Sequence, residues 1–275
     1  MADIRARFWE SKIRNRDNRL SPMWLLRCLA PLLLLALGCI PAAAQCDLYV
    51  AEYKSTTVDV YNTFTDQLVA AIPVQLQPLA VAITPNGAFA YVSNSAKICD
   101  LCGAIQSPSV SVIDTATYNF VATIPEGNYP YGVAITPNRG FAYVTNSASN
   151  NVSIINTATN TVVAAVAVGC GPEAVAITPN GAFAYVANSC DSTISVIDTA
   201  TSTVTTTFNA GGSEPMDLAI TPDGAFAYVS NQISGNLSVI DTASNTVVDS
   251  IQGAPMLSEG VAITRRRDAL TSRCR

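Results

Sequence analysis

The apolar and polar positions of this sequence repeat along the chain. Four segments align without gaps, and in each an apolar run passes through a Thr-Pro turn into the strand sequence Phe-Ala-Tyr-Val. The segments are residues 83–94, 135–146, 177–188 and 220–231. Their prolines lie 52, 42 and 43 residues apart, and the longest interval contains one local insertion. Self-similarity with a period of about forty residues is typical of repeat architectures.

Each repeat predicts four short strands. A Val-Ala-Ile block forms the first, and a turn in which Pro presets φ and Gly supplies a positive φ leads to the second. A block such as Val110–Thr115 predicts the third strand and an Asp-capped turn, and a Thr- and Val-rich block such as Thr161–Val166 predicts the fourth. β-branched residues fill the strand positions without a helical period. We therefore expect an all-β β-propeller of four-stranded blades.

The second strand of each repeat ends in a recurring tetrad. It is Tyr143-Val144-Thr145-Asn146 in one copy, and Tyr-Val-Ser-Asn or Tyr-Val-Ala-Asn in the other three. With these tetrads the sequence resembles the YVTN β-propeller repeat family, which includes bacterial exported and archaeal surface-layer proteins. The resemblance covers nearly all of Leu48–Thr264. A WD-repeat protein is excluded because the sequence has no Trp-Asp and no Gly-His pair.

The repeats predict five blades in residues 45–264. The first blade enters at its second strand, Leu48–Ala51, and the last strand signal, residues 261–264, is a lone first strand. Because this lone strand supplies what the first blade lacks, we expect velcro closure of a five-bladed ring. The resembled family more often has seven blades. An incomplete arc that completes itself in an oligomer is therefore the alternative.

Residues 1–44 predict a signal peptide. Basic residues precede the apolar run Leu29–Gly38, and Ala42–Ala44 forms an A-x-A cleavage pattern. The basic region is long, so translation from Met23 is an alternative. The apolar run is short for a membrane anchor and prolines interrupt it, whereas Cys39 leaves a lipoprotein open. We expect an exported protein, periplasmic, at the cell surface or extracellular, with no membrane span after leader removal.

Composition narrows the chemistry. The chain of 275 residues has no histidine, which excludes Ser-His-Asp and Cys-His catalytic centres and His-ligated metals. Its net charge of −5 is the sum of three unlike parts: a basic leader, a body at 45–264 with 3 basic and 16 acidic residues, and a basic tail at 265–275. So acidic a body predicts no nucleic-acid partner. The tail departs from the repeat; it either contacts an acidic surface or marks a truncated or frame-shifted copy.

Two cysteine pairs predict disulfides. Cys170 and Cys190 flank one predicted hairpin and lie opposite each other at its open end, and export permits a bridge between them. Cys99 and Cys102 lie in the insertion after the first tetrad. That insertion has neither the βαβ setting of a redox motif nor a second pair of zinc ligands, so we expect a bridge that stiffens the loop. We expect no metal and no cofactor.

A propeller places the residue before each first strand at the mouth of its central channel. These positions are Leu79, Tyr131, Glu173, Met216 and Glu259. These five residues differ between repeats although the residues beside them recur. Variable side chains at a shared opening are expected to determine which ligand binds there. The alternative is that they vary because they are exposed. We predict no catalytic residue.

Two recurring polar positions predict structural roles instead. An Asn side chain at the end of the second strand can bond backbone groups where the chain leaves the sheet, and an Asp after the third strand can cap a turn. The first set is Asn94, Asn146, Asn188 and Asn231, and the second is Asp114, Asp198 and Asp241.

These features favour an exported, non-enzymatic propeller that binds a protein or a cell-surface glycan. One alternative is a propeller enzyme of lactonase-like type, using carboxylates such as Glu173 and Glu259. A quinone-dependent dehydrogenase would be expected to have Trp-rich blades, and both tryptophans, Trp9 and Trp24, lie in the leader. Another alternative is a self-assembling surface-layer component.

Overall fold

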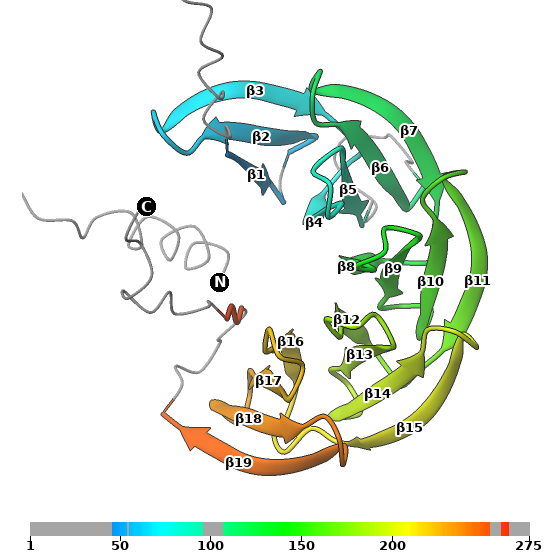
Figure 1. The fold of residues 1–275 in the computed structure, drawn as a ribbon, viewed down its shortest axis with the longest axis vertical. Helices are drawn as coiled ribbons and strands as arrows, with labels where there is room; N and C mark the ends of the chain where they lie inside the picture. The colour runs from blue at the N-terminus through cyan, green and yellow to red at the C-terminus, as the bar shows by residue number, and fades with distance from the viewer. Residues whose placement is uncertain (1–45, 54, 96–106, 254–259, 264–275) are drawn as a thin grey trace, which may run out of the picture. The chain divides into compact units, whose positions relative to one another are not determined.

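The computed structural model describes residues 46–53, 55–95, 107–253 and 260–263 (Figure 1). All of them belong to one compact unit, residues 44–275. Regular structure in these ranges consists of nineteen strands, so the all-β expectation is confirmed. Within the described ranges, no helix has the length and apolar character needed to cross a membrane.

The strands form five antiparallel sheets in chain order. The first contains β1 (Asp47–Ala51), β2 (Thr57–Asn62) and β3 (Gln67–Pro73). The second contains β4 (Pro78–Ile83), β5 (Phe89–Asn94), β6 (Ser109–Asp114) and β7 (Asn119–Pro125). The third contains β8 (Pro130–Ile135), β9 (Phe141–Asn146), β10 (Asn151–Asn156) and β11 (Thr161–Ala167). The fourth contains β12 (Pro172–Ile177), β13 (Phe183–Asn188), β14 (Thr193–Asp198) and β15 (Thr203–Asn209). The fifth contains β16 (Pro215–Ile220), β17 (Phe226–Asn231), β18 (Asn236–Asp241) and β19 (Thr246–Gln252).

The sheets stand side by side, with the first strand of each four-stranded sheet innermost and the fourth outermost (Figure 1). Neighbouring sheets meet along their inner strands: β4 packs against β8, β8 against β12, and β12 against β16. Four-stranded sheets arranged in this way are the blades of a β-propeller.

The predicted turn between the first two strands forms as expected. In the fourth sheet the Thr178 hydroxyl accepts a hydrogen bond from the Phe183 amide at 3.0 Å and donates to the Phe183 carbonyl at 3.2 Å. Gly181 closes the turn with a φ of 73°, which glycine adopts without steric cost. The third sheet places Arg139 in the same backbone conformation, with a φ of 66°.

The hydrophobic core lies between the sheets, in four clusters of buried residues. The Tyr185 cluster, for example, joins Ile194 and Val196 of the fourth sheet to Leu218 and Val229 of the fifth. The other three clusters likewise combine residues from two adjacent sheets. Each sheet is therefore stabilised mainly by its neighbours, as in other repeat proteins.

The tyrosine of the recurring tetrad also links neighbouring sheets. Tyr91 is fully buried and donates to Asn160 Oδ1 of the next sheet at 2.7 Å, and Tyr185 donates to Asn245 Oδ1 at 2.5 Å. Tyr143 is equally buried, but its hydroxyl has no hydrogen-bond partner. The next sheet places Ser202 where the other two pairs have asparagine.

The predicted velcro closure is wrong for the described residues. The first sheet keeps three strands, and residues 261–263 have no strand conformation. The Val261 amide instead donates to Asp217 Oδ2 on β16 at 2.8 Å. Asp217 is the third residue of its inner strand, as Gly132 is of β8. A side chain at this position points toward the next sheet, because a Cβ added at Gly132 would lie 2.5 Å from the Glu173 carbonyl oxygen. Residues 260–263 therefore lie against the fifth sheet, where the inner strand of a following sheet would begin.

Candidate functional site: the mouth of the inner strands

The structure places the predicted mouth residues at one repeated position, the second residue of an innermost strand. They are Leu79 on β4, Tyr131 on β8, Glu173 on β12 and Met216 on β16, and all four are half-buried. Glu259 lies outside the described residues. Since these strands pack side by side, the side chains belong to one surface, and its composition changes from sheet to sheet.

The loop before each inner strand has an unusual and repeated backbone. The residue preceding the strand proline has a positive φ in all four sheets: Gln77 (57°), Tyr129 (59°), Gly171 (63°) and Glu214 (58°). Three of the four are not glycine, and a bulky residue such as tyrosine is uncommon in this region. A backbone hydrogen bond from the second-to-third-strand loop holds each one; the Ser147 amide, for example, donates to the Tyr129 carbonyl at 2.9 Å. The frame of the mouth is thus fixed by the backbone.

A second link positions the mouth residues from the preceding sheet. The Ser93 hydroxyl donates to the Tyr131 carbonyl at 2.5 Å, and the Thr145 hydroxyl donates to the Glu173 carbonyl at 2.9 Å. Both hydroxyls occupy the third position of the recurring tetrad. Sequence reasoning missed this role, although the signal was there: the position is Ser or Thr in three copies and alanine only at Ala187.

The third and fourth sheets give the mouth its distinctive chemistry. The rings of Tyr129 and Tyr131 are 6.2 Å apart and inclined by 36°, a tilted aromatic pair. Glu173 lies on the neighbouring strand, where the Ser189 hydroxyl donates to its Oε1 atom at 3.4 Å. One aromatic ring from the loop before β8, a second from β8 itself and a carboxylate from β12 therefore lie at the same end of two neighbouring strands.

The recurring Asn and Asp side chains make hydrogen bonds within the sheets and turns. The four asparagines are buried, and each donates from Nδ2 to a serine hydroxyl on the next strand at 2.8–3.0 Å. The aspartates accept backbone amides in the turns they begin; Asp198 accepts the amides of Ala200 and Thr201 at 2.9 Å each. These hydrogen bonds lower the pKa of Asp198, led by the one from the Thr201 backbone. Neither set lines the mouth.

Glu126 is a half-buried acid with both carboxyl oxygens buried, and sequence reasoning missed it. It follows β7, where three of the other sheets place apolar residues, Val74, Val168 and Ala210, and the fifth places Gly253. Burial raises its pKa to about 7, although hydrogen bonding from Ser153, the Gly127 amide and Asn146 opposes the shift. Neither carboxyl oxygen makes a hydrogen bond of ordinary geometry, so we regard these donors as near but poorly aligned. Aligning the repeats would have revealed the one acid at an apolar position.

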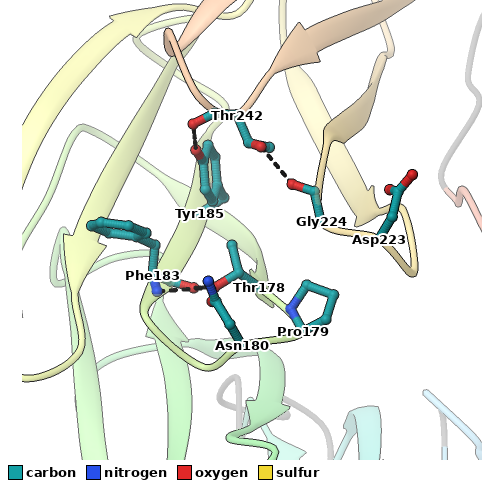
Figure 2. A pocket seen from close by; sticks show the side chains of 8 residues that line it. All are labelled: Thr178, Pro179, Asn180, Phe183, Tyr185, Asp223, Gly224 and Thr242. Atoms are coloured by element: carbon teal, nitrogen blue, oxygen red, sulfur yellow. Dashed lines mark hydrogen bonds between the residues drawn. The ribbon is translucent and has the colours of Figure 1, made fainter.

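A small cavity lies away from the mouth, at the turns between the first two strands (Figure 2). It has a volume of about 180 Å³ between the fourth and fifth sheets, and Tyr185 reaches the Thr242 carbonyl beside it at 3.2 Å. A cavity of about 200 Å³ occupies the corresponding place between the second and third sheets. Both are smaller than most ligand pockets, and their recurrence is a consequence of blade packing.

The cysteines agree in part with expectation. The Cys190 amide donates to the Cys170 carbonyl at 3.2 Å, so the two residues face each other at the open end of the hairpin. Their sulfur atoms are not bonded in the structure. Cys99 and Cys102 lie outside the described residues. No cluster of three or more acidic or cysteine side chains suited to a metal ion occurs in the described part of the chain.

The fold and the repeated mouth define a β-propeller repeat protein. A family model described as "Lactonase, 7-bladed beta-propeller" matches residues 161–263, which is less than half of the chain. This match differs from the expected YVTN family and indicates seven blades, whereas the described residues form five sheets. No curated protein sequence matches the chain significantly.

Solved structures similar to the chain include a hydrazine synthase from Kuenenia stuttgartiensis. It is 26% identical with a TM-score of 0.62, and the match covers 73% of this chain and 61% of that one. A functionally unknown protein from Desulfotomaculum acetoxidans DSM 771 is 22% identical with a TM-score of 0.65, covering 77% and 70% of the two chains. Altogether 1538 solved chains match. So common a fold does not identify the function by itself.

Proposed function

We propose that this protein is an exported, non-enzymatic scaffold that binds a cell-surface glycan at the mouth of its inner strands. The observation that carries the proposal is the tyrosine pair at the start of β8 together with Glu173 on the strand packed against it, β12, on a backbone frame that the other sheets repeat with different side chains. Aromatic faces pack against the apolar faces of sugar rings, and a carboxylate accepts hydrogen bonds from hydroxyl groups. A protein ligand would use the same surface.

Glycan binding is tested with the full chain on an array of envelope polysaccharides, followed by calorimetry on any ligand found. Tyr131→Ala and Glu173→Gln are expected to weaken binding at least about tenfold, the usual loss for a buried contact worth ~1.4 kcal/mol. Tyr131→Phe keeps the ring and is expected to retain most of the affinity. Unchanged binding by the first two variants would exclude this surface.

The family match supports a second candidate, hydrolysis of a lactone. Two carboxyl groups lie on adjacent inner strands, Glu173 on β12 and Asp217 on β16. Burial raises the pKa of Asp217, against hydrogen bonds from the Val261 and Leu218 amides, and a carboxyl group with a raised pKa is suited to proton transfer. A pH-stat assay with simple aldonolactones tests this: turnover that Glu173→Gln and Asp217→Asn abolish would favour the enzyme over the scaffold.

Export is part of the proposal, as is a Cys170–Cys190 disulfide. The facing positions of the two residues in the hairpin support the bridge. Mass spectrometry of the protein recovered from its native envelope tests both, through the N-terminal residue and through the mass difference of about 2 Da per bridge on reduction.

A further inference from the structure

Among the described residues, the first sheet has no counterpart of the innermost strand that every other sheet has. As a result β1 is an open edge strand, whereas the second strand of each other sheet pairs with a first strand on that side. Leu48 on β1 is 51% exposed, whereas the residues at its position in the other four sheets are fully buried alanines: Ala90, Ala142, Ala184 and Ala227. An open edge of this kind presents unpaired backbone groups to another strand.

The chain also contains one spare copy of the missing strand. Residues 260–263 read Gly-Val-Ala-Ile, like residues 132–135 of β8. They lie beside Asp217 on β16 and pair with no strand in the described part of the chain. One open edge and one spare strand thus lie at opposite ends of the row of sheets.

The tetrad tyrosine shows the same complementarity. Tyr228 of the fifth sheet is only half-buried and makes no side-chain hydrogen bond to any described residue, although its counterparts Tyr91 and Tyr185 reach an asparagine in the next sheet. In the first sheet Asp66 occupies the position of those asparagines and has a similar φ, 54° against their 53° and 55°. Its carboxylate has no partner among the described residues. A donor at one end therefore matches an acceptor at the other.

We propose that a second copy of this chain completes the open sheet. Residues 260–263 of one copy form the innermost strand, β1–β3 of the next copy form the other three, and Tyr228 of the first copy donates to Asp66 of the second. The composite blade follows the register of the other sheets, in which Tyr91 pairs with Ala82 and Ala90 with Ile83. Tyr49 would then lie opposite Ala262, and Leu48 opposite Ile263.

This assembly is heterologous, so copies add head to tail. It goes beyond the proposed binding function and does not depend on it. Closure within one chain would use the same two edges, but in the structure residues 260–263 do not pair with β1 of their own chain.

Cysteine crosslinking in the full chain separates these arrangements. Leu48→Cys and Ile263→Cys are made as separate proteins, mixed and oxidised. We expect a crosslinked dimer that neither protein forms alone, and much less of it when Val50→Cys, two residues out of register, replaces Leu48→Cys. The double variant Leu48→Cys/Ile263→Cys serves as the counter-test. A bridge within its monomer, together with no dimer from the mixture, would overturn the proposal.

Light scattering measures the strength of the assembly. The molar mass of the wild-type chain is expected to rise with concentration. Tyr228→Phe and Asp66→Gly are each expected to raise the half-assembly concentration about tenfold or more, because a buried hydrogen bond to a charged group is lost. Asp66→Asn keeps both the acceptor and the positive φ and should assemble nearly normally. A concentration-independent monomer, or normal assembly by both weakened variants, would refute the composite blade.

Discussion

The unpartnered hydroxyl of Tyr143 gives the sharpest test of how neighbouring sheets are held together. Tyr91 and Tyr185 each donate to an asparagine of the next sheet, but Tyr143 faces a sheet that carries Ser202 there. We predict that Ser202→Asn stabilises the protein. The substitution gives Tyr143 the acceptor its counterparts have, and asparagine suits the φ of 55° at this position better than serine does.

The expected gain is about 1–2 kcal/mol. A typical net hydrogen bond contributes about 1 kcal/mol, and satisfying a donor that is already buried without a partner adds part of its desolvation cost. The same reasoning predicts opposite results for two tyrosine variants. Tyr143→Phe should be nearly neutral because its hydroxyl bonds nothing, whereas Tyr185→Phe should cost about 1–2 kcal/mol.

Urea unfolding followed by circular dichroism provides the measurement, with the four proteins of the Ser202/Tyr143 double-mutant cycle compared under one condition. The reasoning requires that the gain from Ser202→Asn largely disappears in the Tyr143→Phe background. If Ser202→Asn stabilises both backgrounds equally, the benefit comes from turn propensity alone. If it stabilises neither, the hydroxyl already has an acceptor and the inter-sheet link is refuted.

Three further predictions concern other parts of the molecule. The folded-state pKa of Glu126 is raised to about 7. The free energy of unfolding should therefore be highest below about pH 4.5 and decrease by up to ~3 kcal/mol as the pH rises to about 7. Glu126→Val should remove this pH dependence, measured by urea titrations at several pH values. If Cys170 and Cys190 are bridged, reductant should lower the urea midpoint, by up to ~3 kcal/mol of stability, but leave the double serine variant unchanged. Gly132→Ala should cost about 1–3 kcal/mol in the same assay, because its Cβ would lie 2.5 Å from the Glu173 carbonyl oxygen.

The sequence predicted the strands well because each one is specified locally. The turn between residues 178 and 183 needs only its own threonine, proline and glycine to form the hairpin. The short runs of mostly apolar residues that follow form β13 and β14, whose interior residues are all buried. Closure was predicted wrongly for the opposite reason. Whether the fifth sheet meets the first depends on the angle between neighbouring sheets, which no single repeat encodes.

The mouth was predicted in outline only. Its four described positions follow from counting along the repeat, so Tyr131 and Glu173 could be placed on adjacent strands. The positive φ of Tyr129 could not be foreseen, since it depends on a contact with a segment more than fifteen residues away. The recurring Ser or Thr of the tetrad indicated a role for Ser93, but the sequence did not show that its hydroxyl bonds the Tyr131 carbonyl of the next sheet. Glu126 was within reach, because a comparison of the repeats shows an acid where its counterparts are apolar.

The sharing of each core cluster by two neighbouring sheets has a consequence for how such chains evolve. Each junction between the described sheets is filled by apolar side chains from both sheets, and at two of them the tetrad tyrosine also bonds an asparagine in the turn after the third strand of the next sheet. Removing or duplicating one repeat unit by recombination therefore brings together two surfaces that are already complementary. The number of blades can change in a single genetic step, while the mouth residues of the remaining blades keep their places and diverge independently.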